Sequence, residues 1–155
     1  IKIHPTYKNA FLLLGNCYNY QKQYEKSAEY YREALRIDPE YKEAKGNLAI
    51  TLREGGKQAG ELAHDAQKAL KMLTESYEIN SADLETTRLL GVANGILGNH
   101  QKAIEYFQKV VDADPKNARS LFDLGTAWIF AGDAAKGKAM QQKAMELDPA
   151  AFKKQ

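Results

Sequence analysis

The four prolines of the chain, Pro5, Pro39, Pro115 and Pro149, follow a regular spacing. The first two lie 34 residues apart, and so do the last two. The 76 residues between the two pairs divide into 34 and 42, with Ser81 at the place of a proline. A period of this size is typical of proteins built from stacked structural repeats. The spacing therefore predicts a repeat protein whose second repeat is eight residues longer than the others.

Each period contains two segments with the pattern of an amphipathic helix. In residues 24–39 and 100–115, small and aliphatic side chains recur at helical spacing, and Asp-Pro closes the segment. Proline ends a helix because it lacks the N–H group, yet it suits the first turn of the next helix. The other helix of each period is predicted in residues 11–20, 45–54, 87–96 and 121–130. We therefore expect an all-α fold of helix pairs.

A leucine followed by a small residue recurs at one position of these first helices. The small residue is Gly15, Ala49, Gly91 or Gly125. A glycine inside a helix costs about 1 kcal/mol relative to alanine, so three glycines at one repeat position require a packing reason. We expect neighbouring helices to approach each other closely at these glycines.

Together these features resemble the tetratricopeptide repeat family, whose unit is a pair of antiparallel helices over about 34 residues. The matching residues are Phe11, Leu14, Gly15, Tyr18, Tyr31, Ala34 and Pro39 in the first repeat, Leu90, Gly91, Ala103, Phe107 and Pro115 in the third, and Leu121, Leu124, Gly125, Trp128, Ala144 and Pro149 in the fourth. The departures are Ser27, Thr87, Asn94, Val110, Gly137 and Gln141. The resemblance covers nearly the whole chain and implies a right-handed α-solenoid of about four helix-turn-helix repeats.

The same comparison predicts where each repeat begins and ends. The expected repeats are residues 8–41, 42–83, 84–117 and 118–151. Residues 1–7 are interpreted as the end of a truncated preceding repeat, because residues 3–5 match residues 37–39, and residues 152–155 as the start of a following helix. The chain is therefore interpreted as a segment of a larger protein, and its uncovered ends predict end-to-end self-association.

The eight surplus residues of the second repeat lie within residues 55–67. Two structures are compatible with them. The second helix of the repeat begins early, by about two turns, or the connection is a longer loop, which Gly55, Gly56 and Gly60 favour. Such insertions lie on one face of a repeat protein and are either functional or simply tolerated.

Composition and the placement of reactive side chains argue against several classes of function. The net charge of +2 and the absence of a basic block do not indicate a nucleic-acid binder, and no apolar run has membrane-spanning length. The single cysteine, Cys17, excludes an internal disulfide and is predicted to be a buried structural residue. His4, His64 and His100 are scattered and show no catalytic or metal-ligand spacing. We expect no enzyme, metal site or cofactor, and nothing indicates a compartment.

The resemblance implies that the first helix of every repeat lines a concave groove. The candidate groove residues are Asn9, Leu12, Asn16, Asn19, Tyr20, Asn47, Ile50, Arg53, Arg88, Val92, Phe122, Asp123, Thr126 and Phe130. An amide can both donate to and accept from a peptide backbone, so Asn16 and Asn47 are candidates for holding an extended ligand; the alternative is that they are merely solvated. Phe122 and Phe130 either form an anchor pocket or pack against a following repeat.

One subclass of the family binds the acidic C-terminal tails of chaperones through a clamp of lysines, asparagines and an arginine. The clamp asparagines fall on Asn16 and Asn47, but the cationic positions fall on Leu12, Glu85 and Leu89, so a terminal carboxylate lacks a strong partner. That ligand is disfavoured. The sequence predicts a scaffold that binds a peptide segment or partner helix in its groove. The alternative is a structural spacer or self-association module of a catalytic or membrane-anchored parent.

Overall fold

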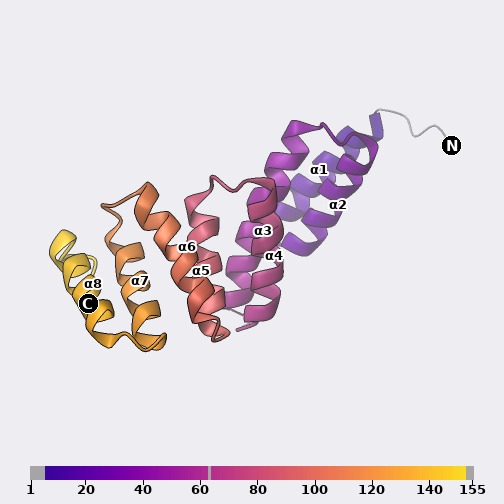
Figure 1. Cartoon of the computed structure of the whole chain (residues 1–155). Coiled ribbons are helices and arrows are strands. Elements are labelled where there is room, and N and C mark those ends of the chain that lie inside the picture. The colour runs from indigo at the N-terminus through magenta and orange to yellow at the C-terminus, as the bar shows by residue number, and fades with distance from the viewer. Residues whose placement is uncertain (1–5, 63, 153–155) are drawn as a thin grey trace. The chain divides into compact units, whose positions relative to one another are not determined.

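The computed structural model describes residues 6–62 and 64–152, and these residues form eight α-helices and no strand (Figure 1). The helices are α1 (Thr6–Tyr20), α2 (Tyr24–Ile37), α3 (Lys42–Glu61), α4 (Ala66–Ile79), α5 (Leu84–Ile96), α6 (His100–Ala113), α7 (Ala118–Phe130) and α8 (Ala134–Leu147). The predicted all-α fold is confirmed. The predicted end of a preceding repeat at residues 1–5 lies outside the described residues, as do residues 153–155.

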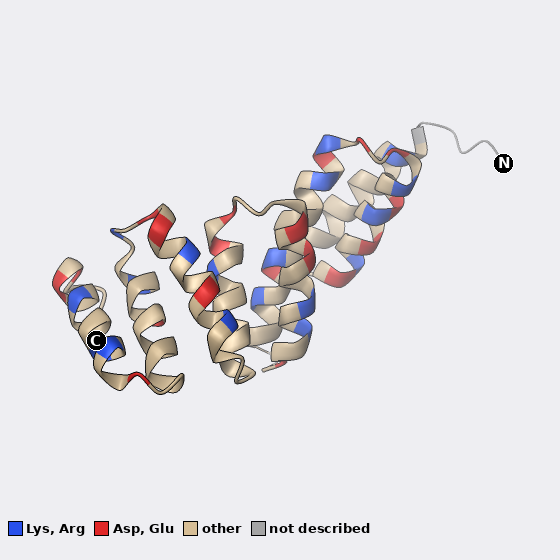
Figure 2. Cartoon of the chain, in the orientation of Figure 1, with Lys and Arg blue, Asp and Glu red and all other residues tan. Residues whose placement is uncertain are grey.

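The helices fall into two compact units. The first extends to Ala82 and contains α1 to α4; the second begins at Asp83 and contains α5 to α8. Within each unit the helices pack in chain order, so that each unit is a stack of two helix hairpins. Figure 2 shows acidic and basic residues interspersed on the helices of each unit. None of the described helices is long and apolar enough to cross a membrane.

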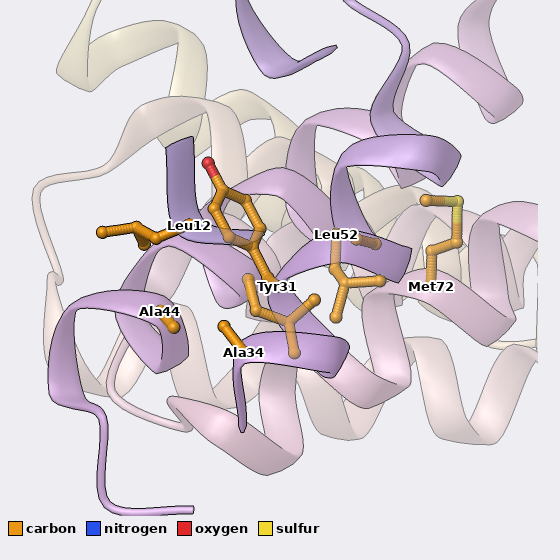
Figure 3. Packing of buried hydrophobic residues seen from close by; sticks show 8 residues of the cluster. Leu12, Tyr31, Ala34, Ala44, Leu52 and Met72 are labelled. Carbon is orange, nitrogen blue, oxygen red and sulfur yellow. The ribbon is translucent and has the colours of Figure 1, made fainter. Parts of the chain in front are cut away.

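The core of the first unit surrounds α2, which packs on both α1 and α3 (Figure 3). Ala34 and Ala44 are completely buried, and their small side chains let the helix backbones come close together. Larger side chains fill the remaining space. The cluster consists of Leu12, Ala28, Tyr31, Ala34, Ala44, Leu48, Leu52 and Met72. In the second unit the corresponding cluster joins α6 to α7 and consists of Ala103, Ile104, Phe107, Leu124 and Ala127.

The glycines of the first helices lie where two helices approach closely, as expected. A Cβ atom added to Gly15 would lie 2.5 Å from Cε1 of Tyr31, and one added to Gly91 would lie 2.7 Å from Cε1 of Phe107. A Cβ atom on Gly125 would lie 2.6 Å from the carbonyl oxygen of Gly137. The first two glycines therefore make room for an aromatic ring, and the third makes room for the backbone of α8.

The surplus residues of the second repeat lengthen its first helix, so the predicted early start of the second helix is wrong, and the predicted loop is wrong for residues 55–61. The 20-residue α3 runs through Glu61, whereas α1, α5 and α7 have 15, 13 and 13 residues. The second helix α4 does not begin early: it starts three residues before Ala69, as α2 starts three residues before the matching Ser27. Residues 55–61 are helical and form no loop.

Close packing explains why the glycines of α3 do not break the helix. Gly55 and Gly56 are buried. A Cβ atom on Gly55 would lie 2.9 Å from Cβ of Tyr24, and one on Gly56 would lie 2.7 Å from Cγ of Leu73. Glycine permits this close crossing with α2 and α4, and the buried apolar contacts offset its unfavourable helix propensity.

Candidate functional site

A shallow hollow in the first unit collects the amide-rich residues predicted for the groove. It has a volume of about 320 Å³ and is lined by Asn16, Asn19, Tyr20, Tyr31, Asn47 and Ile50. Five of these six residues are predicted from the sequence, and they come from α1 and α3. We call this site the first-unit hollow.

Tyr31 reaches the first-unit hollow from α2 and is not predicted as a groove residue, because the repeat pattern marks it as a core aromatic. Its ring is buried above Gly15, and its hydroxyl donates a hydrogen bond of 2.6 Å to Oδ1 of Asn16. Burial raises the pKa of this hydroxyl, so it stays protonated and remains a donor. The matching residue of the third repeat is Phe107, which has no hydroxyl. The hydroxyl of Tyr31 is therefore the only sequence signal that this residue forms a hydrogen bond in the hollow.

The amides of Asn16 and Asn47 form a pair in the first-unit hollow. Nδ2 of Asn47 donates to Oδ1 of Asn16 over 3.1 Å, so this oxygen accepts two hydrogen bonds, one from Asn47 and one from Tyr31. Nδ2 of Asn16 and Oδ1 of Asn47 have no hydrogen-bond partner among the described residues. The pair therefore offers one donor and one acceptor to a ligand.

Neighbouring polar residues of the first unit are already paired. Asn19 donates from Nδ2 to the hydroxyl of Thr51, Asn9 accepts at Oδ1 from the hydroxyl of Tyr41, and Arg53 forms an ion pair with Glu54. Tyr20 is almost fully exposed at the edge of the hollow. These contacts leave Asn16 and Asn47 as the residues with the clearest capacity to bind a backbone.

A second hollow, in the second unit, collects four further predicted residues, Val92, Asp123, Thr126 and Phe130. Its volume is about 530 Å³. The remaining lining residues are Gly91, Gly95, Ile96, Gly98, His100, Ala103, Phe107 and Ala127. We call this site the second-unit hollow. The contributions of His100, Ala103 and Phe107 are not predicted, because they lie on α6 rather than on a first helix.

Asp123, which lines the second-unit hollow, belongs to a network of charged residues. Arg88 forms two hydrogen bonds of 3.0 Å with the carboxylate of Glu85, and its Nη1 lies 3.4 Å from Oδ2 of Asp123. Nε of Arg119 lies 3.6 Å from Oδ1 of Asp123. Burial raises the pKa of the Asp123 carboxyl, although both arginines act in the opposite direction. Arg88 is thus engaged within the protein, as is Asp123.

Three predictions about individual residues need correction or refinement. Leu12 belongs to the buried core, because α2 covers it, and is not available in a groove. Cys17 is exposed rather than buried; the matching Thr51 and Ala127 are covered by a preceding hairpin, whereas no described helix precedes α1. Phe122 stacks on Phe152 with ring centroids 4.9 Å apart, which agrees with the alternative that it packs against the segment after the last helix.

Residues that could support metal-ion chemistry do not gather in the described part of the chain. No group of three or more His, Cys, Asp or Glu side chains is placed to hold a metal ion among residues 6–62 and 64–152. Both hollows instead present amide and apolar surface, which suits the binding of a polypeptide.

Comparison with known proteins identifies the repeat. Profiles of the tetratricopeptide repeat match residues 9–41 and residues 89–117. The formate-dependent nitrite reductase complex subunit NrfG of Escherichia coli O157:H7 is 29% identical over 112 residues, which are 72% of this chain and 54% of that protein. The protein CTR9 homolog of Arabidopsis thaliana is 27% identical over 131 residues, which are 84% of this chain and 12% of that protein. The chain therefore spans about half the length of the first relative and a small part of the second.

Solved structures with a similar fold include MamA from Desulfovibrio magneticus RS-1, with a TM-score of 0.64 and 21% identity over 94% of this chain and 78% of that one. YrrB, described as a TPR protein with an unusual peptide-binding site, has a TM-score of 0.61 and 18% identity over 90% and 86% of the two chains. The repeat matches support the tetratricopeptide repeat family, and the solved structures show that the chain shares their fold. Its general function is that of a protein-interaction scaffold, a class that is typically not catalytic.

Proposed function

We propose that the chain binds an extended segment of a partner protein, with Asn16 and Asn47 hydrogen-bonded to the backbone of that segment. The supporting observation is the pairing of the two amides. It leaves Nδ2 of Asn16 as a donor and Oδ1 of Asn47 as an acceptor, without partners among the described residues. A peptide unit offers the complementary C=O and N–H groups. This contact holds the backbone and leaves the partner's side chains to be selected elsewhere.

Two relatives are consistent with this proposal. NrfG is by its name a subunit of an enzyme complex, and YrrB carries a peptide-binding site on the same fold. Within this chain, the support is the rigid placement of Asn16. The hydroxyl of Tyr31 and the amide of Asn47 hold its oxygen from two sides, so little side-chain freedom remains to be lost on binding.

We expect that replacing both Asn16 and Asn47 with alanine weakens the binding of a partner peptide by about tenfold, because each lost hydrogen bond contributes about 0.5–1.5 kcal/mol. Short peptides selected from a random array by the purified chain would be titrated by fluorescence anisotropy. Gln67→Ala is the matched control, since Gln67 is an exposed amide of the same unit. A double variant that binds every selected peptide as tightly as the native chain would contradict the proposal.

Backbone recognition has a separate test in N-methylated versions of a selected peptide. N-methylation removes one backbone N–H, and the position that donates to Asn47 should be the sensitive one. That methylated peptide should bind the native chain weakly, yet bind the Asn47→Ala variant as well as the unmethylated peptide does. If, at every methylated position, the loss of affinity from methylation and the loss from Asn47→Ala simply add, Asn47 does not contact the peptide backbone.

One observation favours the second candidate function, a self-association module. Leu14 on α1 is 41% exposed, whereas the matching Leu48, Leu90 and Leu124 are 3%, 0% and 1% exposed. An apolar side chain that is buried at this position of the other hairpins is open in the first. Association through this face predicts an oligomer that light scattering detects at high concentration and that Leu14→Glu dissociates. A chain that stays monomeric at every concentration would exclude this candidate.

A further inference from the structure

We propose that the second-unit hollow selects the partner segment by its side chains. The hollow takes one bulky apolar side chain, and Arg119, which pairs with the lining residue Asp123, binds a carboxylate of the same segment. This inference rests on the proposed function, because it assumes an extended polypeptide ligand. It goes further by stating which residues that ligand carries.

The second-unit hollow has apolar walls that are open to a ligand. Ile96 on α5 and Phe130 on α7 are 66% and 68% exposed, although both are large apolar side chains. The ring of Phe130 is held by stacking on His100, with centroids 5.7 Å apart. Phe107 and Ala103 of α6 also line the hollow, and both are buried. A bulky side chain inserted here would cover the apolar surface that these walls now expose to water.

Thr126 and Asp123 are polar side chains that line the second-unit hollow, and both are paired within the protein. The hydroxyl of Thr126 donates to the carbonyl oxygen of Phe122 over 3.1 Å and accepts from Nε2 of Gln141 over 2.9 Å. The carboxylate of Asp123 lies between Arg88 and Arg119. Apart from the imidazole of His100, the lining therefore offers no unpaired polar side chain, and an apolar group is its best occupant.

Comparison of the two units shows how this chemistry arises. Val92 occupies the repeat position of Asn16, and Phe107 occupies that of Tyr31. The hydrogen bond between Tyr31 and Asn16 in the first unit is thereby replaced by two apolar side chains in the second. The glycine beneath the ring, Gly15 or Gly91, is the same in both. The same scaffold thus presents an amide site in one unit and an apolar site in the other.

Charge defines the second requirement on the ligand. The side chain of Arg88 is 17% exposed and engaged by two carboxylates, whereas that of Arg119 is 71% exposed and lies 3.6 Å from the Asp123 carboxylate, beyond hydrogen-bonding distance. Asp123 is the only partner of Arg119 among the described residues. The open charge at this rim is therefore positive, and a guanidinium binds a carboxylate through two parallel hydrogen bonds.

The distance between the two contacts sets a spacing in the ligand. Arg119 and Phe130 lie at opposite ends of α7, eleven residues apart, which is about 16 Å of helix. An extended chain rises about 3.3 Å per residue. The acidic residue and the bulky apolar residue of the ligand should therefore be separated by about five positions.

The main probe is a synthetic Gly/Ser peptide that carries one glutamate and one tryptophan about five positions apart. Two control peptides differ from it by one residue each: lysine replaces glutamate in the first, and serine replaces tryptophan in the second. Binding to the 15N-labelled chain is followed by nuclear magnetic resonance. The backbone amides of Gly91, Gly95 and Gly98 report on the second-unit hollow, and the side-chain amides of Asn16 and Asn47 report on the first. We expect the Glu/Trp peptide to shift the glycine signals. The control peptide with serine in place of tryptophan should bind at least tenfold more weakly.

Two protein variants test the two contacts. Gly95→Leu places an apolar side chain in the hollow; its Cβ atom meets only Cβ of Ala103, at 3.9 Å, and the variant should weaken binding of the Glu/Trp peptide at least tenfold. Arg119→Glu should reverse the charge preference, so that the lysine peptide binds about fivefold better than the glutamate peptide. The unchanged thermal unfolding of Arg119→Glu would serve as the control for folding.

The possible results separate this inference from the proposed function. Shifts confined to Asn16 and Asn47 would overturn the inference and leave the proposed function standing. The inference would be supported by shifts at the glycines that Gly95→Leu abolishes, together with a preference for the lysine peptide in Arg119→Glu. This would hold even if Asn16→Ala and Asn47→Ala had no effect. Absence of any shift would overturn it, and so would equal binding of the glutamate and lysine peptides to both the native chain and the Arg119→Glu variant.

Discussion

Replacing Tyr31 with alanine is expected to lower the free energy of unfolding of the first unit by about 3–5 kcal/mol, the range observed when a buried aromatic side chain is removed. Tyr31 is only 2% exposed and packs in the cluster that joins α1, α2 and α3. Its removal would leave a cavity above Gly15 that the rigid helix backbones cannot close. Urea unfolding followed by far-ultraviolet circular dichroism would measure the loss.

Tyr31→Phe separates the packing of the ring from the role of its hydroxyl. The ring is retained, and only the 2.6 Å hydrogen bond to Asn16 is lost, so the free energy of unfolding should fall by about 1 kcal/mol. Because the hydroxyl also holds the amide of Asn16, this variant should bind a selected peptide several-fold more weakly. A Tyr31→Phe chain with native peptide affinity would show that Asn16 does not depend on Tyr31 for its placement.

Replacing Gly125 with alanine is expected to destabilise the second unit by about 2 kcal/mol, within the range for overpacked cores. The added Cβ atom would lie 2.6 Å from the carbonyl oxygen of Gly137, which is backbone and cannot rotate away. Helices α7 and α8 would have to separate to accommodate it. Trp128, the single tryptophan of the chain, lies on α7, so its fluorescence reports on unfolding at this place.

Gly95→Ala is the matched control in the same unit. A Cβ atom on Gly95 meets only Cβ of Ala103, at an ordinary contact distance of 3.9 Å. This substitution should therefore stabilise the unit by up to about 1 kcal/mol, the helix-propensity difference between the two residues. Opposite signs at Gly125 and Gly95 would show that helix contact decides the effect. A Gly125→Ala unit as stable as the native one would contradict the close crossing of α7 and α8.

The glycines of the first helices show which part of the helix packing a repeat pattern can predict. The recurrence of Gly15, Gly91 and Gly125 predicts a close helix contact, because glycine is unfavourable in a helix without one. The pattern does not indicate what occupies the space. It is a tyrosine ring, a phenylalanine ring or the backbone of α8, depending on the residues available in the following helix.

The surplus residues of the second repeat show where local signals fail. Gly55, Gly56 and Gly60 favour a loop by their intrinsic preferences, yet residues 55–61 extend α3. Helix propensity is a weak local preference, and contacts distant in sequence override it. Here those contacts come from Tyr24 and Leu73, which pack against the glycines from α2 and α4.

By itself the sequence determined the period, the pairing of helices within it and the family, because these depend on residue spacing along the chain. It also predicted five of the six residues of the first-unit hollow and four of the twelve residues of the second-unit hollow, since repeat phase places those residues on the open side of the first helices. Only the tertiary structure decided that Leu12 is buried, that Cys17 is exposed and which amide atoms of Asn16 and Asn47 are unpaired. Burial and hydrogen bonding depend on the neighbouring helix that covers each side chain, and that neighbour is a property of the packed hairpins.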